Sequence, residues 1–278
     1  MTQWSDRLRL TLSANAQAYA QHAGVAWYHS LGNPGIVLFP PSNDGMVHGN
    51  FQPQSYQAIV GHAQWAPRLR KPHSSRTRAL PPPFNTSACE MDSCTSSDAL
   101  LMNIMCYPGV VRGNVSALLG VPDDAEPHFG VPGAVPLQGG RTDATEVDMR
   151  IGGTHVEAKL TETSFTTQRA AIVAQYQGLR DVFDHDALPR VASATADEPD
   201  YVSYQLLRNV LAIARHPHRH FRVLLDSRRP DLLREWWTIF GAIRDPAVRS
   251  RCGFVLWQEL AVACPAPLQE FLVRKYGL

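Results

Sequence analysis

The 278-residue chain has little lysine and no long hydrophobic run. Its only lysines are Lys71, Lys159 and Lys275, whereas arginine is abundant. No apolar stretch approaches the roughly 20 residues that span a bilayer. The N-terminal stretch carries Asp6, Arg7 and Arg9 where a signal peptide would be apolar. We therefore expect a protein with no membrane partner and a cytoplasmic location.

Cysteine pairs and several well-known catalytic motifs are also missing. The five cysteines are scattered and never spaced as CxxC, which argues against a disulfide framework or a zinc ribbon and predicts reduced thiols. The sequence contains no Gly-rich phosphate loop, nucleophile elbow or HExxH motif. Any enzymatic activity must therefore come from another constellation of side chains.

Charge is unevenly distributed, although the formal net charge is only +1. Residues 121–200 hold 14 acids and 6 bases, whereas residues 201–251 hold 10 arginines and 4 acids. Residues 68–78 add six basic residues, His73 included, and no acid. This division can place an acidic, cation-binding pocket beside basic surfaces that meet phosphates. The alternative is that these charges form ordinary solvated faces.

Periodicity is weak in the first third of the chain and clear in the remainder. A helix is predicted from Ser5, with Leu8, Leu12, Ala16 and Tyr19 on one face. Residues 30–94 are rich in Pro, Gly, Ser, His and aromatics, which predicts irregular loops anchored by aromatic side chains. We therefore expect an N-terminal extension over 1–94 and a folded core over 95–278.

The core region reads as an α/β protein with a mixed sheet. "TSSDALLMNIMCYPG" predicts a short buried helix that is capped by Ser96 or Ser97 and stopped at Tyr107-Pro108. A hairpin at 145–162 follows, and helices are predicted from about 166 to Phe183 and over about 201–215. A strand "FRVLL", a helix opened by Pro230, a strand "CGFVLW" and terminal helical turns complete the order. This order is typical of a mixed sheet flanked by helices.

The hairpin "TEVDMRIGGTHVEAKLTE" has an unusually charged polar face. In its first strand apolar residues alternate with Glu146, Asp148 and Arg150, and a Gly-Gly turn leads into the second strand. There Glu157 and Lys159 share one face because side chains alternate along a strand. The alternative interpretation is an exposed hairpin with an ordinary cross-strand cluster of charges.

Two carboxylates on neighbouring strands make a hard, oxygen-rich site. Asp148 and Glu157 suit Mg²⁺ or Mn²⁺, and the main-chain carbonyl of Ala158 is a third candidate ligand. Lys159 cannot bind a cation while protonated, but it can position or help deprotonate a water molecule and stabilise charge on a phosphate. The sequence therefore predicts that metal, water and phosphate meet at this hairpin.

This Asp-x8-Glu-x-Lys arrangement, preceded by a capped helix, resembles the PD-(D/E)xK nuclease superfamily. Asp148 corresponds to the metal-binding aspartate, Glu157 to the second acid and Lys159 to the lysine, although Val147 replaces the motif's proline. With "SSDALLMNIMCYP", "KLTETSF", "YQLLRNVLA" and "RVLLD", the chain from about 95 onward resembles a bacterial family of restriction-endonuclease-like proteins in that superfamily. The resemblance implies a restriction-endonuclease-like αββαβ core, divalent-metal catalysis and DNA as the default substrate.

Further residues are candidates for auxiliary or binding roles. The resemblance assigns Gln168 or Gln175 to a glutamine that many members carry on the helix after the hairpin, and Asp98 to an acid of the first core helix. Glu146 is a further auxiliary candidate. Basic and polar candidates for nucleic-acid contact are Arg68, Arg70, Lys71, Gln205 and Arg208, where the last two and Asn209 can instead support the hairpin.

The function expected from the sequence is thus divalent-metal-dependent hydrolysis of phosphodiester bonds, most simply in DNA. The alternative is a catalytically silent nucleic-acid-binding or interaction module that retains the nuclease fold. The oligomeric state stays open, a homodimer included.

Overall fold

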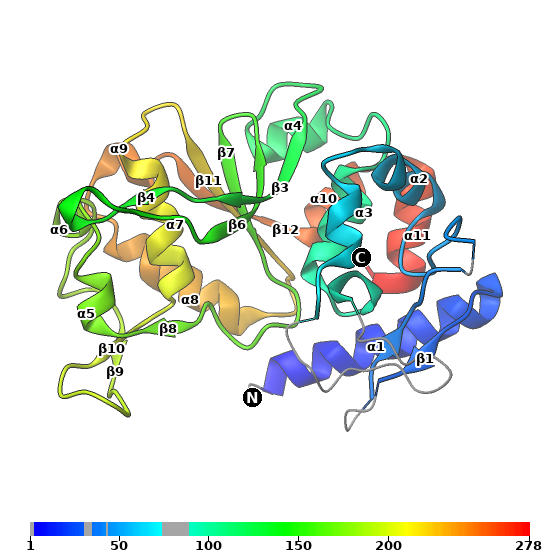
Figure 1. Cartoon of the computed structure of the whole chain (residues 1–278), viewed down its shortest axis with the longest axis horizontal. Helices are drawn as coiled ribbons and strands as arrows, with labels where there is room; N and C mark the ends of the chain where they lie inside the picture. Colours follow the sequence, from blue (N-terminus) through cyan, green and yellow to red (C-terminus); the bar gives the residue numbers. More distant parts are fainter. Residues whose placement is uncertain (1–2, 31–34, 43, 74–88) are drawn as a thin grey trace.

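The computed structural model describes residues 3–30, 35–42, 44–73 and 89–278. Its centre is a five-stranded sheet in the order β12-β11-β7-β6-β3, with helices on both faces (Figure 1). Strand β11 is parallel to both β7 and β12, whereas β6 is antiparallel to both β7 and β3. The expected mixed α/β sheet of a restriction-endonuclease-like protein is confirmed.

The strands of this sheet are β3 (Pro127–Pro132), β6 (Glu146–Ile151), β7 (Thr154–Ala158), β11 (His220–Leu225) and β12 (Cys252–Leu256). Smaller pairings join β1 (Tyr28–His29), β2 (Val37–Leu38), β4 (Val135–Pro136), β5 (Thr142–Asp143), β8 (Thr167–Gln168), β9 (Arg190–Val191) and β10 (Asp200–Val202).

The α-helices are α1 (Gln3–Ala23), α2 (Pro53–Gly61), α3 (Ser97–Met105), α4 (Asn114–Leu119), α5 (Ala170–Val173), α6 (Leu179–Val182), α7 (Tyr204–Ala214), α8 (Pro230–Ala242), α9 (Pro246–Arg249), α10 (Trp257–Ala263) and α11 (Ala266–Tyr276). Short 3-10 helices are η1 (Ala66–Arg70), η2 (Glu90–Asp92) and η3 (Gln138–Gly140). None of the helices in the described part of the chain is long and apolar enough to cross a membrane.

The predicted hairpin is present with the predicted division of faces. Met149 of β6 pairs with Val156 of β7, and both belong to the hydrophobic core beneath one face of the sheet. The turn is made by Gly152, whose φ is +52°, and by Gly153, where an added Cβ would lie 2.8 Å from a main-chain oxygen of His218. Glycine is therefore required at 152 because of the positive φ and at 153 because a Cβ has no room.

Separate hydrophobic cores cover the two faces of the sheet. One face packs against α3, α4, α10 and α11, together with residues of α1. The other face, which includes Val223 of β11, packs against α7, α8 and α9. Because Val223 pairs with Glu157, the polar side chains of the hairpin point to the face that α7 covers.

The short buried helix before the hairpin is also confirmed. Ser96 caps α3, because its hydroxyl accepts a hydrogen bond from the N–H of Ala99 at 3.1 Å. Every residue of α3 is buried. The helix therefore packs against the sheet along its whole length, and this packing fixes the position of Asp98 in its first turn.

The described residues before 74 form more regular structure than their composition indicates. The predicted N-terminal helix is confirmed as α1, which packs along α11 (Figure 1) and adds Leu8 and Leu12 to a core shared with the sheet. The expectation of irregular structure over 30–94 is wrong at α2, which begins at Pro53 after a Gln52 cap. Gln52 is an uncommon cap residue, so the helix-start signal was limited to Pro53 at the first helical position. The predicted loop at 80–84 lies outside the described residues.

The predicted continuous helix from about 166 to Phe183 is wrong. The chain instead forms β8 and the short helices α5 and α6. Gly178 has a φ of +77°, and Tyr176 pairs with Leu137 as an isolated β-bridge. The sequence predicts one buried stripe of Ile172, Tyr176, Leu179 and Phe183; the last three are buried, whereas Ile172 is half-buried. Burial of a spaced set of apolar residues thus did not require a helix here.

Candidate active site

The two hairpin carboxylates meet where the pairing of β6 and β7 ends. Beyond the pair formed by Met149 and Val156, Asp148 Oδ2 accepts a hydrogen bond from the N–H of Ala158 at 2.7 Å. The aspartate side chain therefore takes the place of a main-chain partner across the hairpin. This contact brings Asp148 beside Glu157, the residue before Ala158.

Glu157 and Lys159 form a buried ion pair. Their side chains are almost fully covered, with the whole residues 1% and 6% exposed. Lys159 Nζ lies 2.8 Å from Glu157 Oε1 and 5.8 Å from the centre of the Phe165 ring. The main-chain carbonyl of Lys159 accepts a hydrogen bond from Trp257 Nε1 at 2.9 Å. These contacts hold the lysine in one position beside the acids.

The charges of the site alter the ionisation of its members. Burial, followed by the charges of Glu157 and Asp98, raises the pKa of Asp148 well above its ordinary value. Burial opposes the ammonium of Lys159, but Glu157, Glu162 and Asp148 outweigh it and raise the lysine pKa. Lys159 is therefore a permanent cation at neutral pH, suited to holding a water molecule or a phosphate oxygen rather than accepting a proton.

The donor set fits a hard divalent cation. Glu157 Oε1 is buried and contacts Lys159 Nζ. Burial and the neighbouring acids raise the pKa of Asp148, so a bound cation would favour its ionised form. Carboxylate oxygens with a main-chain carbonyl, here that of Ala158, are ligands that Mg²⁺ and Mn²⁺ accept. Within the described residues, however, no group of three or more His, Cys, Asp or Glu side chains is arranged to hold a metal. A cation here would rely on two side chains only.

Two side chains of helix α7, Arg208 and Asn209, form hydrogen bonds that hold the hairpin. Asn209 Nδ2 donates to Glu157 Oε2 at 2.8 Å, and the Arg208 guanidinium donates both to the main-chain oxygen of Glu146 at 2.9 Å and to Asn209 Oδ1 at 3.1 Å. Arg208 is 2% exposed. Of the two roles considered for Arg208, the structure supports the structural one. Gln205, one turn earlier, has a buried Oε1 without a hydrogen-bond partner among the residues that the structure describes.

Asp98, the acid of the first core helix, forms ion pairs with two basic side chains from the N-terminal third. Asp98 Oδ2 lies 2.8 Å from Arg68 Nη2 and 2.5 Å from Lys71 Nζ. Arg68 Nη1 also lies 3.3 Å from Glu146 Oε2. Arg70, on the same 3-10 helix, is exposed. Arg68 and Lys71, two of the candidates for nucleic-acid contact, thus pair with the acids Asp98 and Glu146, and the charge of Asp98 in turn acts on Asp148.

The two glutamine candidates lie away from the hairpin. Gln168 accepts from the N–H of its neighbour Arg169, and Gln175 accepts from Arg141 and donates to the oxygen of Ala171. Neither makes a hydrogen bond to the hairpin acids within the described chain. Both assignments depended on a continuous helix after the hairpin, and that helix does not form.

Sequence reasoning did not identify one acid that affects the site. Glu162 raises the pKa of Lys159, and its two oxygens accept from the Ser97 hydroxyl at 2.6 Å and from the N–H of Leu160 at 2.7 Å. Glu162 therefore ties the end of the hairpin to the start of α3. The visible signal was an acid three residues after Lys159, still within the same charged stretch.

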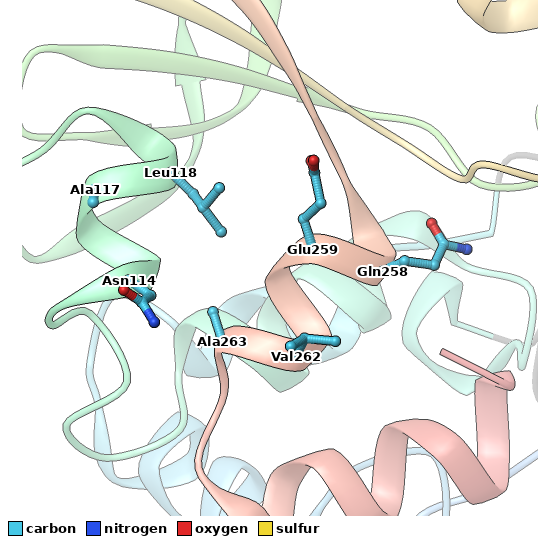
Figure 2. A pocket seen from close by; sticks show the side chains of 7 residues that line it. All are labelled: Asn114, Ala117, Leu118, Gln258, Glu259, Val262 and Ala263. Carbon is cyan, nitrogen blue, oxygen red and sulfur yellow. The ribbon is translucent and has the colours of Figure 1, made fainter.

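A separate hollow lies between α4 and α10 (Figure 2). It has a volume of about 700 Å³ and is lined by Asn114, Ala117, Leu118, Gln258, Glu259, Val262 and Ala263. None of the hairpin residues contributes to this lining. Its largely apolar walls provide no paired carboxylates, so the hairpin and not this groove is the candidate active site.

Comparison with known proteins gives one match. The family described as "Restriction Endonuclease associating with ARP" matches residues 13–277. No curated protein and no solved structure matches the chain. The match extends over the N-terminal third as well as the sheet, its flanking helices and the hairpin. The chain therefore belongs to the family of restriction-endonuclease-like proteins described as associating with ARP.

Proposed function

We propose that this chain is a PD-(D/E)xK-type endonuclease that hydrolyses phosphodiester bonds in DNA with Mg²⁺ or Mn²⁺. The observation that carries the proposal is the meeting of Asp148, Glu157 and Lys159 across one hairpin, where Glu157 Oε1 is buried and lies 2.8 Å from Lys159 Nζ. Membership of a restriction-endonuclease-like family supports nuclease activity.

Each residue of the site has a distinct role in this proposal. Asp148, Glu157 and the carbonyl of Ala158 would hold the cation, which supplies Lewis-acid activation of water and neutralises phosphate charge. Lys159 remains protonated, so it donates hydrogen bonds to the attacking water or to a phosphate oxygen and stabilises charge that develops there. Asn209 holds the Glu157 carboxylate in its orientation.

The family description names an association with ARP, and we extend that association to this chain as part of the proposal. The nucleic-acid partner follows from the reaction proposed. Exposed Arg70 and the half-buried Gln205 are the remaining candidates for its contact, since Arg208 is engaged with Glu146. Arg68 and Lys71 are both paired with Asp98.

The test compares cleavage of labelled duplex, branched and single-stranded substrates in Mg²⁺, Mn²⁺ or EDTA. We expect wild-type cleavage only with a divalent cation, and Lys159→Ala to lower the rate at least about 100-fold because one charge-stabilising donor is lost. Arg234→Ala, an exposed arginine on α8, serves as the matched control and should cleave normally. Circular dichroism should show both variants folded.

Undiminished cleavage by Lys159→Ala would overturn the assignment of the site. DNA binding without metal-dependent turnover in the wild type would instead favour the catalytically silent binding module. A salt-dependent affinity would then remain, because phosphate contacts release counterions whether or not the bond is cleaved.

A further inference from the structure

Two cations from the N-terminal third neutralise the acid that stands next to the hairpin. Arg68 and Lys71 both approach the same oxygen of Asp98, at 2.8 Å and 2.5 Å. The Arg68 and Asp98 side chains are only 13% and 8% exposed. Partly buried ion pairs of this kind are little screened by solvent or salt. Asp98 is therefore not available as a free carboxylate for a second metal ion.

The space for Arg68 is provided by Gly130 of strand β3. Gly130 has a φ of +60°, and a Cβ built at this position would lie 2.1 Å from Arg68 Nη1 and 3.1 Å from Glu146 Oε2. Only glycine leaves room for the guanidinium at this point. The arginine thus occupies a site formed by the sheet itself, between Asp98 and Glu146, rather than a position on the open surface.

The balance of charge favours one divalent cation. With every group ionised, Asp98, Glu146, Asp148, Glu157 and Glu162 carry five negative charges, and Arg68, Lys71, Lys159 and Arg208 carry four positive charges. The difference is one negative charge, so one divalent cation and one phosphodiester bring the total to zero. A second divalent cation would leave two uncompensated positive charges in a partly buried site, which is costly.

We infer that this site binds a single divalent cation, and that Arg68 and Lys71 occupy the place beside Asp98 that a second cation would otherwise take. The inference rests on the proposed function and makes the segment around η1 part of the active site. Asp98 is then a positioning residue for Arg68 and Lys71 and not a metal ligand.

The test counts Mn²⁺ ions bound per chain, by electron paramagnetic resonance of the free ion, in the intact protein without nucleic acid. Wild type should bind one. Arg68→Gln with Lys71→Gln should bind two, because Asp98 and Glu146 are then unpaired carboxylates beside Asp148. Adding Asp98→Asn to that double variant should return the count to one.

Two single variants keep the test informative if the double variant does not fold. Arg70→Gln removes a positive charge from the same 3-10 helix without touching Asp98, and it should still bind one ion. Asp98→Asn in the otherwise wild-type chain should also bind one ion, because Asp98 is not a ligand.

The inference is overturned if wild type binds two ions, if Asp98→Asn alone loses an ion, or if a folded double variant still binds one. Each of these results leaves metal-dependent cleavage intact and so spares the proposed function. A wild-type protein that binds no Mn²⁺ and cleaves no substrate would overturn both.

Discussion

The amide of Asn209 lies 2.8 Å from Glu157 Oε2, and it joins helix α7 to a hairpin acid that is 52 residues earlier in the chain. Arg208 holds the amide oxygen of Asn209, so the amide nitrogen must face the carboxylate. Glu157 therefore has one oxygen fixed by the protein and the other, Oε1, turned toward Lys159. The orientation of the candidate ligand depends on a residue outside the hairpin.

The first prediction concerns this support. Asn209→Ala removes the donor to a buried carboxylate and should lower the free energy of unfolding by about 1–3 kcal/mol. It should also weaken Mn²⁺ binding about 10- to 100-fold, as loss of outer partners of metal ligands does. Urea unfolding and Mn²⁺ titration measure the two effects. Wild-type Mn²⁺ affinity in a folded Asn209→Ala protein would show that Glu157 needs no such support.

The second prediction concerns the raised pKa of Asp148. The folded state retains the proton above the ordinary carboxyl pKa of about 3.9, so this group makes the metal-free protein less stable as the pH rises from there. Asp148→Asn should therefore raise the free energy of unfolding in EDTA at pH 7, by about 1.4 kcal/mol for each pKa unit of the shift.

This gain should vanish below about pH 4, where the carboxyl is protonated in both states. Added Mn²⁺ should reverse the order, because it stabilises only the chain that binds it. Thermal unfolding at several pH values, with EDTA or with Mn²⁺, checks both statements. Equal stability of the two proteins in EDTA across this pH range would contradict the prediction.

The third prediction concerns Lys275, which is 1% exposed on helix α11. Its Nζ donates to the Tyr276 hydroxyl at 2.6 Å and lies over the rings of Tyr276, Phe39 and Phe271, at 3.8, 5.5 and 5.5 Å from their centres. The rings favour the ammonium, but burial costs more and lowers the pKa of Lys275 well below its ordinary value. The lysine pairs with no carboxylate among the described residues.

Because the unfolded chain binds this proton up to about pH 10.4 and the folded chain does not, stability should rise with pH through that range. Lys275→Met should therefore raise the free energy of unfolding at pH 7 by about 1–4 kcal/mol, and the difference should close toward pH 10.4. Arg274→Met, at an exposed neighbouring position, is the control and should show no such pH dependence. A destabilised Lys275→Met protein would contradict the burial cost.

Local sequence was a reliable guide where one element has a clear period and clear ends. Alternating side chains and a Gly-Gly turn predicted the hairpin, and a serine cap with a following Tyr-Pro predicted α3. The same reasoning failed between 166 and 183, where apolar spacing of nearly four residues arose from short elements that are separated by Gly178. It also missed α2, whose Gln52 cap is uncommon.

The sequence by itself determined that Asp148, Glu157 and Lys159 share one face of a hairpin, because side-chain direction alternates along a strand. Only the tertiary structure decided what surrounds them. It placed Asn209 on Glu157, set Glu162 beside the hairpin's end and brought Arg68 and Lys71 onto Asp98, and it left Gln168 and Gln175 elsewhere. These contacts join residues 27 to 65 positions apart and depend on how helices pack on the sheet, so the local periodicity of the sequence does not predict them.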